Sequence, residues 1–555
     1  MQIIYSKMNR SWHSFVKGFA GLSLVAVSVS LPAVAQEQGL NAGMYFYPGN
    51  LVVSRSVYDN DAKNVKVGAL LPTNCAETVG PCVAATNNGK YPEVFNNVIP
   101  DPSFGITSAI YLDQITPSGF LLDSLEVPNS SFKKIRSESN QLVTSFSSKS
   151  EIALNLSTDH KFLTLMGYVA PVDTIDVSNS NTPGAVDPTN PVGSSYYRAV
   201  ATVNHVGKFT FTETDAYSGN NGRAAILNNS YGADMFYAAG NAGNGSNPQP
   251  NGVVLGAGAQ LITPSTAPES FQNVMAPTPL SSFSVTELGD KADKIGKDDN
   301  YRGLTIFNDV VYFTKGSGSN GVNTVYFVDT TGTACPTGVG IPAVGAPLPI
   351  SALTYDPSKL QTTGLPNNMC ILAGFPTVLA KTATAPAAPF GLFFANAETL
   401  YVADEGDGYT GGSDLYTHAA AQTTAGIQKW IFNNSTQSWS LAYTLQTDLG
   451  LGTPYTINKY PTGNNPATNL PWSPATDGVR NITGTVAGGS VTLYAITSTV
   501  SGNGDTGADP NRLVTITDSL VNTETTKAAK EKFTIVRRAD FAEVLRGVSF
   551  APDTK

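Results

Sequence analysis

The sequence predicts an all-β fold made of similar small sheets, and three observations support this. A short phrase recurs in which one residue, often arginine, precedes a small residue and an apolar run; the copies begin at Arg223, Arg302, Phe390, Arg480 and Arg546. Four copies are followed by a second strand centred on an aromatic residue, as in a repeated strand–turn–strand unit. Glycine (52) and proline (35) are frequent and charged residues make up only 14% of the chain, which is typical of a turn-rich β protein.

The clearest unit runs from Pro389 to about Leu445. Strands are predicted at 390–394 and 400–404 and, after a loop rich in glycine and aspartate, at 426–431 and 439–443. Four short antiparallel strands of this kind form one blade of a β-propeller. The sequence pattern of this unit resembles NHL-type propeller blades. The pattern consists of Pro-x-Gly-apolar, apolar-Tyr-Val-Ala-Asp and Ile-x-Lys-aromatic segments. The resemblance implies the fold and little more, because such blades carry many functions.

The same pattern predicts four further complete blades and a sixth that is shared between the chain ends. The complete blades start near residues 151, 223, 302 and 480. Residues 546–551 form an inner strand with nothing after it, and the strands expected at 51–53, 109–112 and 120–122 have no inner strand before them. A propeller closes when one blade takes strands from both ends, which leaves few free edges.

We therefore predict a single six-bladed β-propeller over residues 36–555, closed by pairing of the N- and C-terminal strands. Seven blades is the alternative, because the segment 329–388 is long and irregular.

Residues 1–35 read as an export signal. Basic residues precede an apolar run from Phe19 to Leu31, and Ala33-Val34-Ala35 gives the small-x-small pattern of a cleavage site. The run is too short to span a bilayer. We expect cleavage before Gln36 and a secreted or periplasmic protein with no membrane span.

Net charge argues against nucleic acid as a partner. Removal of the signal segment takes away three basic residues, which leaves 30 of 33 against 42 acidic ones and changes the formal charge from −9 to −12. A chain this acidic repels phosphate backbones.

The four cysteines predict two disulfides, because an even count in an exported protein is typical of disulfide pairing. Three pairings can be drawn, and proximity favours Cys75–Cys82 and Cys335–Cys370. A metal site is the alternative, but no Cys-x-x-Cys spacing supports it.

Long connections follow the second strand of each predicted blade, on the face where the inner strands begin. They cover 55–107, 168–195, 240–252, 315–323, 405–425 and 499–511. Loops of uneven length carried by rigid sheets mark a functional surface, and tolerated insertions are the alternative.

The repeated arginines are predicted to surround the mouth of the central channel on this face. The candidate ligand-binding residues are Arg223, Arg302, Arg480 and Arg546. Converging guanidinium groups bind carboxylate or phosphate. The ring is incomplete, because Ser150 and Phe390 stand at two of the positions. The alternative is that each arginine pairs with an aspartate or a backbone carbonyl of a neighbouring blade.

Trp472 stands between two prolines and is a candidate for stacking on a sugar at the surface.

Acidic loops are candidate calcium sites. The candidate ligands are Asp404, Glu405, Asp407 and Asp414 in one loop and Asp505 and Asp509 in another, with Asp59 and Asp61 in a third. Calcium takes oxygen ligands from flexible loops. The spacing does not match an EF-hand, and ordinary turn chemistry is the alternative.

We predict a protein that binds an anionic small molecule, a polysaccharide or another protein through the loops at the channel mouth. The alternative is a calcium-dependent hydrolase of a phosphate ester or lactone, in which calcium polarises the substrate and arginines hold the oxyanion. The phrase from Tyr401 to Glu405 resembles a segment of β-propeller phytases, and no active-site residue is carried over from it. A quinone-dependent dehydrogenase ranks lowest, because the repeated tryptophans of such proteins are missing.

Overall fold

The computed structural model of the chain describes fourteen main stretches between residues 45 and 555. They are 45–59, 106–132, 141–145, 152–174, 196–214, 216–230, 234–241, 258–264, 300–316, 321–350, 368–384, 387–466, 468–503 and 506–555, with short pieces at 61, 64, 70–71, 83–84, 177, 180–183, 280–282 and 284–285. The predicted signal segment, Cys75, Cys82 and Asp505 lie outside the described residues.

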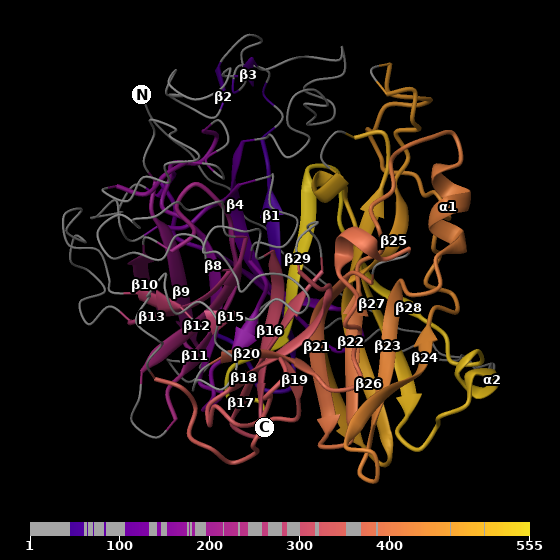
Figure 1. The fold of residues 1–555 in the computed structure, drawn as a ribbon. Helices are drawn as coiled ribbons and strands as arrows, with labels where there is room; N and C mark the ends of the chain where they lie inside the picture. The colour runs from indigo at the N-terminus through magenta and orange to yellow at the C-terminus, as the bar shows by residue number, and fades with distance from the viewer. Residues whose placement is uncertain are drawn as a thin grey trace, which may run out of the picture. The chain divides into compact units, whose positions relative to one another are not determined.

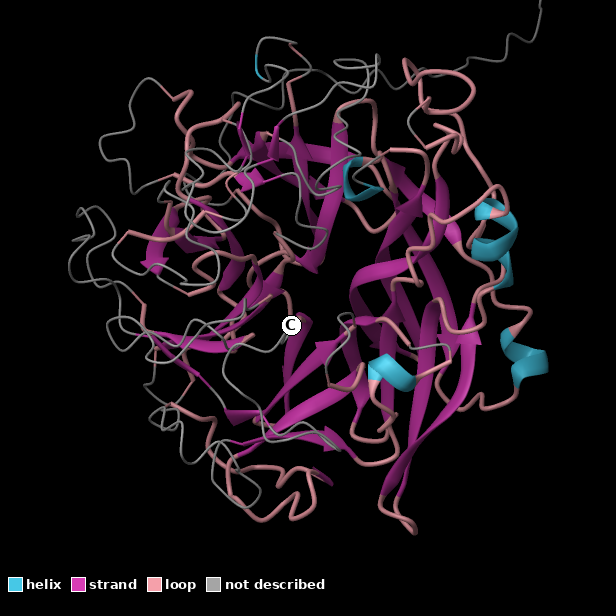
Figure 2. Cartoon of the chain, turned by 45° about the horizontal axis from the view of Figure 1, so that its top comes forward, coloured by secondary structure: helices cyan, strands magenta, loops and turns pink. Residues whose placement is uncertain are grey.

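Six antiparallel sheets form the blades of a ring (Figures 1 and 2). Their inner strands, in the order of blades 1 to 6, are β29 (Glu543–Phe550), β7 (Asn155–Leu156), β11 (Gly222–Asn228), β16 (Tyr301–Phe307), β21 (Pro389–Asn396) and β25 (Ala475–Ala487). Each inner strand contacts the inner strands of both neighbouring blades, so the six close into a circle. The predicted six-bladed propeller is confirmed.

The remaining strands pair outward in chain order. Blade 1 has β1 (Leu51–Val57), β4 (Thr107–Ile115) and β5 (Leu121–Glu126); blade 2 has β8 (Phe162–Tyr168), β9 (Arg198–Asn204) and β10 (Phe209–Thr214); blade 3 has β12 (Met235–Gly240), β13 (Ala259–Ile262) and β14 (Leu280–Ser282). Blade 4 has β17 (Val310–Lys315), β18 (Thr324–Asp329) and β20 (Asn368–Leu372); blade 5 has β22 (Thr399–Asp404), β23 (Gly426–Asn433) and β24 (Ser438–Leu445); blade 6 has β26 (Ser490–Val500), β27 (Arg512–Ser519) and β28 (Thr534–Arg538).

Short strands and helices lie in the connections between the strands of the blades. Short strands are β2 (Leu70–Leu71), β3 (Val83–Ala84), β6 (Thr144–Ser145), β15 (Ser284–Val285) and β19 (Val339–Gly340), and the helices are α1 (Leu415–Ala421), α2 (Thr525–Ala528), η3 (Ala380–Thr382) and η4 (Thr506–Ala508). None of the helices in the described part of the chain has the length and apolar character needed to cross a membrane.

The chain ends close the ring in blade 1. Strand β1 pairs antiparallel with β29, with Leu51 opposite Phe550 and Val53 opposite Val548. The last strand of the chain is therefore the inner strand of the blade that the N-terminal strands build, as predicted. The edge that β29 would otherwise expose is paired.

The irregular segment 329–388 does not form a seventh blade in its described part. It contributes β19 and β20, which join the sheet of blade 4. Cys335 and Cys370 form the predicted disulfide, with 6.1 Å between their Cα atoms, and tie the connection before β19 to β20.

The small residue of the recurring phrase lets neighbouring inner strands approach closely. A Cβ atom on Gly303 would collide with the carbonyl oxygen of Phe390 in the next blade, and one on Gly547 would meet the backbone of Leu154. At the copies that carry glycine, the small residue is explained by backbone contact between blades, because a side chain would not fit there. The copies at Arg223 and Arg480 carry Ala224 and Asn481 instead.

A buried hydroxyl also joins neighbouring blades at three places. Ser54 donates to the carbonyl oxygen of Ile152, Thr164 to that of Ala225 and Thr314 to that of Phe390. Each hydroxyl belongs to the second strand of one blade, and each acceptor belongs to the start of the next blade. Each bond therefore joins the backbone of one blade to a buried side chain of its neighbour.

Candidate functional site

The long connections lie where the sequence predicts them. The strand bounds place those of blades 4, 5 and 6 at 316–323, 405–425 and 501–511, each following the second strand. Because the inner strands begin on the same face, these loops lie beside the first residues of β16, β21 and β25.

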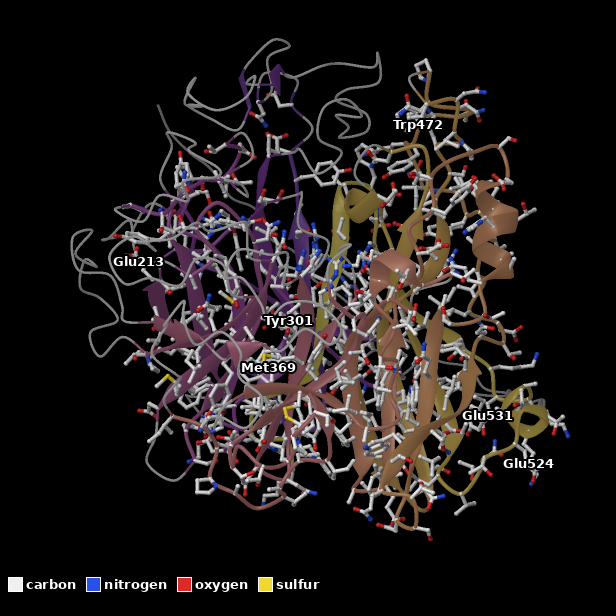
Figure 3. All side chains as sticks on the ribbon, viewed as in Figure 1. Glu213, Tyr301, Met369, Trp472, Glu524 and Glu531 are labelled. Atoms are coloured by element: carbon white, nitrogen blue, oxygen red, sulfur yellow. A yellow bond between two sulfur atoms is a disulfide. The ribbon has the colours of Figure 1, made fainter. Side chains whose placement is uncertain are left out.

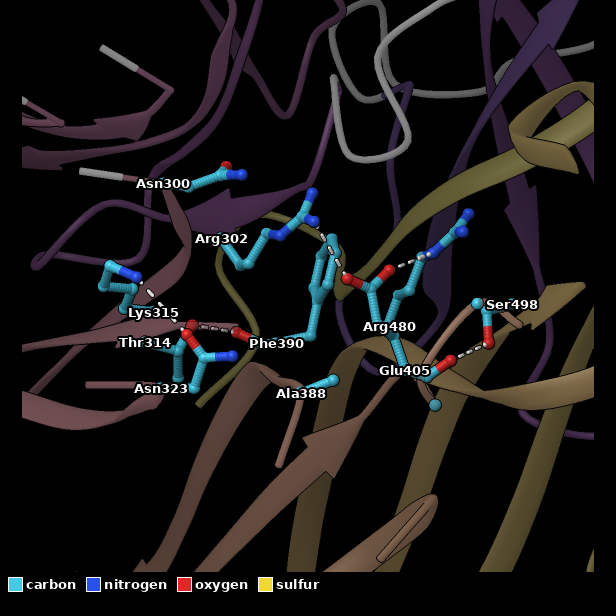
Figure 4. A network of polar contacts seen from close by, with 12 residues as sticks. Asn300, Arg302, Thr314, Lys315, Asn323, Ala388, Phe390, Glu405, Arg480 and Ser498 are labelled. Carbon is cyan, nitrogen blue, oxygen red and sulfur yellow. Dashed lines mark hydrogen bonds and ion pairs between the residues drawn. The ribbon is translucent and has the colours of Figure 1, made fainter. Parts of the chain in front are cut away.

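Glu405 lies between two arginines from the flanking blades (Figure 4). Its Oε1 is 3.2 Å from Nη2 of Arg302 in blade 4, and its Oε2 is 3.0 Å from Nε of Arg480 in blade 6. The three side chains are only 6–8% exposed. A buried carboxylate between two guanidinium groups needs this geometry to offset the cost of desolvation.

The backbone of Glu405 is also fixed. Its N–H donates to the carbonyl oxygen of Ala388 at 3.0 Å, and its carbonyl oxygen accepts from the Ser498 hydroxyl at 2.5 Å. The residue immediately follows β22, so the end of that strand positions its side chain toward the channel. Blades 4, 5 and 6 therefore meet at one carboxylate.

The other two arginines of the predicted ring bind neighbouring structure. Arg223 donates from Nη1 to the carbonyl oxygen of Tyr301 at 2.8 Å and also contacts the side chain of Asn300, both in the segment of the next blade. Arg546 contacts the Ser56 hydroxyl at 3.4 Å. Arg223 therefore pairs with a neighbouring blade, as the alternative interpretation of the arginines expects. Arg302 and Arg480 also pair with a neighbouring blade, and both bind the same glutamate.

A cavity of about 230 Å³ opens beside Glu405 on the long-loop face. Its polar lining consists of Arg302, Asn323, Glu405, Asp407, Asp477, Arg480 and Thr499. We call it the mouth pocket. Arg223 and Arg546 are not among its lining residues, so two of the four predicted arginines come together there.

A second cavity, of about 430 Å³, lies at the opposite ends of the inner strands. Residues of all six inner strands line it, together with the C-terminal residues Thr554 and Lys555. The recurring arginines do not reach it.

Asp477 is a pocket residue that the sequence did not single out. It lies in β25, three positions before Arg480, and is almost fully buried. Its carboxyl group accepts from the backbone N–H of Gly408 at 2.9 Å and from Nε2 of Gln422 at 2.5 Å. Burial, with a smaller contribution from the charge of Asp407, raises the pKa of Asp477 to about 7.

Glycine at position 406 lets the blade 5 loop approach this carboxyl group. Gly406 has φ +81°, and a Cβ there would lie 2.5 Å from Oδ2 of Asp477. Any other residue would push the loop away from the pocket wall.

Asp404 fixes the conformation of the same loop through hydrogen bonds. Its carboxyl group accepts from the backbone N–H groups of Ala388 and Gly406 and from the side chain of Gln428. Burial raises its pKa to about 6. The group holds the strand end and the loop together, and its oxygens already have protein donors.

Asp407 and Asp414, the other two predicted calcium ligands of this loop, have partners on or near α1. Asp407 lies 2.6 Å from Nε2 of His418. Tyr409 stacks on His418 with 3.9 Å between ring centroids, and its hydroxyl donates to Asp414 at 3.0 Å. Of these side chains, Asp407 lines the pocket, and the others lie beside it on the loop and on α1.

Within the described residues, the one group of three clustered metal-ligand side chains is Asp329, Cys335 and Cys370. Both of its cysteines belong to the disulfide. Calcium binding by the loop of blade 5 therefore stays a prediction. In the third loop, Asp59 accepts from the backbone N–H of Asp61 at 3.0 Å, as in an ordinary turn.

The surface prediction for Trp472 is wrong. The residue is 0% exposed and lies in the connection between β24 of blade 5 and β25 of blade 6 (Figure 3). The backbone of Gly502 packs against Leu470 and Pro471 and covers this turn. A tryptophan between prolines reads as an exposed turn in the sequence, and here a second loop covers it.

Asp509 does not reach the mouth pocket. It is buried in the β26–β27 connection, where its carboxyl group accepts from the Tyr460 hydroxyl at 2.9 Å. The predicted acidic residues that the structure describes are thus divided among blades 1, 5 and 6.

No protein-family model and no curated protein matches the chain, so the NHL-type resemblance has no support from a family match. Among solved structures, the chain is similar to an α-L-arabinofuranosidase from Fusarium graminearum in complex with an iminosugar inhibitor, at 11% identity and a TM-score of 0.23, over 60% of this chain and 75% of that one.

It is also similar to a B. megaterium levansucrase mutant, at 9% identity and a TM-score of 0.22, over 91% of this chain and 94% of that one. A third similarity is to the NanB sialidase of Streptococcus pneumoniae, at 10% identity and a TM-score of 0.21, over 79% and 63% of the two chains. Likeness this weak supports no inference about function.

Proposed function

We propose that the mouth pocket binds a small anionic molecule that also carries hydroxyl groups, such as a sugar acid or a sugar phosphate. The observation that carries the proposal is the pairing of two buried arginines with one glutamate at the pocket wall. One carboxylate neutralises one of the two guanidinium charges, so the group keeps a net positive charge.

Arg480 offers the contact for an anion. Its Nε is used by Glu405, and its two terminal nitrogens make no hydrogen bond with the described residues. In Figure 4 they point away from Glu405. Two parallel N–H groups of a guanidinium match the oxygens of a carboxylate or a phosphate.

The rest of the lining suits hydroxyl groups. Asn323 and Asp477 can donate or accept hydrogen bonds, and the Thr499 hydroxyl, which donates to Thr506, can still accept one. A volume of about 230 Å³ corresponds to a single sugar ring rather than a polymer segment. Asp407 also lines the pocket, and its carboxylate lies 2.6 Å from Nε2 of His418.

Calorimetric titration with glucuronate, glucose 6-phosphate and glucose tests this proposal. The two anions should bind, and glucose should bind at least tenfold more weakly. Arg480→Lys keeps the charge beside Glu405 and removes the terminal nitrogens, so it should lower affinity for the anions about tenfold or more. Arg537→Lys is the matched control, because Arg537 pairs with Asp113 outside the pocket. Equal binding of all three sugars, or no effect of Arg480→Lys, would contradict the proposal.

A hydrolase is the second candidate, and Asp477 favours it. A carboxyl group with a pKa of about 7 is partly protonated at neutral pH and can donate a proton to a leaving oxygen. Phosphate esters and lactones, assayed with and without calcium, test this candidate. Loss of turnover in Asp477→Asn with binding retained would separate a hydrolase from a binding protein.

We also propose that the protein is exported and that residues 1–35 are removed. The basic start, the apolar run and the Ala33-Val34-Ala35 pattern support this. Mass spectrometry of the protein from the culture medium or periplasm should find Gln36 as the first residue, and an intact N-terminus there would contradict it.

A further inference from the structure

The end of β26 and the β26–β27 connection of blade 6 contain a buried layer of side-chain oxygen atoms that borders the mouth pocket at Thr499. Thr499, Ser501, Asn503 and Asp509 contribute to it, and each is at most 3% exposed. Asp505, in the same connection, lies outside the described residues and is no part of the argument.

Asp509 and Asn503 are joined by a hydrogen bond that fixes the orientation of the amide. Nδ2 of Asn503 donates to Oδ1 of Asp509 at 3.3 Å, and the Tyr460 hydroxyl donates to the same oxygen at 2.9 Å. The reverse orientation of the amide would set its oxygen against the carboxylate. Oδ1 of Asn503 is therefore an acceptor close to the carboxyl group.

Two acceptor atoms in this layer have no donor among the described residues. They are Oδ2 of Asp509 and Oδ1 of Asn503, and both are buried. Buried acceptors are nearly always satisfied by a donor, a water molecule or an ion. An adjacent pair of unsatisfied oxygens points to one bound group that serves both.

Neither of the nearby hydroxyl groups lies within hydrogen-bond geometry of Oδ2 of Asp509. Hydrogen bonds from Ser501 and Thr499 act on the pKa of Asp509, but the Thr499 hydroxyl donates at 2.6 Å to the carbonyl oxygen of Thr506. The Ser501 hydroxyl oxygen accepts from the backbone N–H of Asn503 at 2.9 Å. Both hydroxyl oxygens keep a lone pair that a cation can use.

We propose that Oδ2 of Asp509 and Oδ1 of Asn503 bind a calcium ion, with the Ser501 hydroxyl oxygen as a further ligand and water completing the shell. The donor set consists of carboxylate, amide and hydroxyl oxygens with no nitrogen or sulfur, which suits a hard cation. Calcium accepts an irregular shell of six to eight oxygens and so suits this set better than magnesium, which requires a stricter octahedral shell.

The neutral surroundings of Asp509 support a cation there. Burial raises the pKa of Asp509 to about 6, and the groups that most counteract this are the side chains of Ser501, Tyr460, Asn503 and Thr499, none of which is cationic. A bound cation would supply the missing positive charge.

The ion would stabilise one wall of the mouth pocket. Thr499 lines that pocket, and its hydroxyl holds Thr506 in η4 of the same connection. With one carboxylate, the site should be weak, with a Kd of about 10⁻⁴–10⁻³ M, which is useful where extracellular calcium is abundant. The proposal stands independently of what the mouth pocket binds.

Terbium luminescence tests the site directly, because Tb³⁺ replaces calcium and takes up energy from a nearby tyrosine. Tyr460 bonds to Asp509 and is the expected sensitiser. Tyrosine excitation should give saturable Tb³⁺ emission that calcium displaces at concentrations near the expected Kd. The same concentrations of magnesium or sodium should not displace it.

Three variants and one control locate the signal. Asp509→Asn should abolish both the emission and the calcium-dependent rise in Tm. Tyr460→Phe should keep the rise in Tm and lower the emission in part, because Tyr58, Tyr416 and Tyr455 also lie near Asp509. Asn503→Asp adds a charged ligand and should tighten calcium binding about tenfold. Asp448→Asn, at an exposed pair with Lys532, should change neither readout.

Unchanged emission in Asp509→Asn would overturn the proposal. So would the lack of any calcium-dependent change in the Tm of the wild-type protein at about 10 mM, roughly ten times the weakest expected Kd. If Asp509→Asn fails to fold, the gain expected for Asn503→Asp decides the matter, since its absence would equally overturn the site.

Discussion

Oε2 of Glu405 lies 3.0 Å from Nε of Arg480, although the two residues are 75 positions apart in the sequence. The contact crosses from the end of β22 in blade 5 to the inner strand of blade 6. Together with Arg302 it makes one buried carboxylate the junction of three blades. Stability and ligand binding at the channel mouth should therefore respond to the same residue.

Glu405→Gln should destabilise the protein strongly. The change leaves the guanidinium groups of Arg302 and Arg480 close together in a buried place without their counter-charge, which typically costs about 3–5 kcal/mol. Calorimetry should show a clear fall in Tm. Glu524→Gln, at an exposed pair with Lys527, is the control and should have almost no effect. A Tm equal to that of the wild type would mean that the arginines do not need this charge.

The buried carboxyl group of Asp477 should make stability fall as pH rises from about 4 to 7. Its pKa is 3.8 unfolded and about 7 folded, so the folded state binds more protons in this window. The contribution of this group to the free energy of unfolding is therefore largest below pH 3.8. It decreases as pH rises through 7, by an amount on the order of 4 kcal/mol in total.

Asp477→Asn removes this titration. Its Tm should exceed that of the wild type at pH 8 and should differ little at pH 4.5, because the amide stays neutral throughout. Scans of Tm against pH measure the difference. Asp404 and Asp509, with pKa values near 6, contribute slopes of the same sign that both proteins share. Parallel curves for wild type and variant would show that Asp477 is not the titrating group.

The sequence was enough for the architecture because the blade repeat is local. The unit from Pro389 to Leu445 contains all four of its strands in order, and alternation with turns predicts each of them. Closure followed from unmatched strands at the two ends, which only pairing with each other could satisfy. The structure adds the reason for the small residue in the phrase, which is backbone contact at positions such as Gly303.

The candidate site was only half accessible from the sequence. The repeat identified Arg302 and Arg480, and the acidic loop identified Glu405. No sequence pattern indicates that these three residues lie close together in the fold. The sequence did not identify Asp477, because a single aspartate within a predicted strand has no distinguishing pattern. Its role becomes visible only when the structure shows that it is buried and accepts a hydrogen bond from Gly408. The prediction for Trp472 was wrong because the loop that buries it comes from another part of the sequence.

The hydroxyl bonds between blades should each stabilise the ring. Thr314→Val keeps the shape of the side chain but removes the donor to the carbonyl oxygen of Phe390, which then lies buried without that bond. Loss of such a donor costs about 1–3 kcal/mol. Thr515→Val is the matched control, because the Thr515 hydroxyl bonds within blade 6 and is only partly buried.

Thermal unfolding of the two variants measures this difference. Thr314→Val should lower Tm more than Thr515→Val does. Equal shifts would show that the contact between blades contributes no more than an ordinary bond within a sheet.

The disulfide should matter because it restrains the segment that could have formed a seventh blade. Cys335 and Cys370 enclose a sequence separation of 35 residues, and the bond ties the start of that segment to β20. Removing a native disulfide typically costs about 2–5 kcal/mol, mainly by freeing the unfolded chain. The double variant Cys335→Ser and Cys370→Ser should therefore melt earlier than the wild type.

Reduction provides the control for this variant. Treatment with a reductant should lower the Tm of the wild type toward that of the double variant and should leave the variant itself unchanged. Because blade 4 keeps its pairing of β18 with β20 in either case, the far-UV circular-dichroism spectrum of a β protein should persist below the transition. A wild-type Tm that does not respond to reductant, with both thiols shown to be free, would mean that strand pairing alone holds the segment.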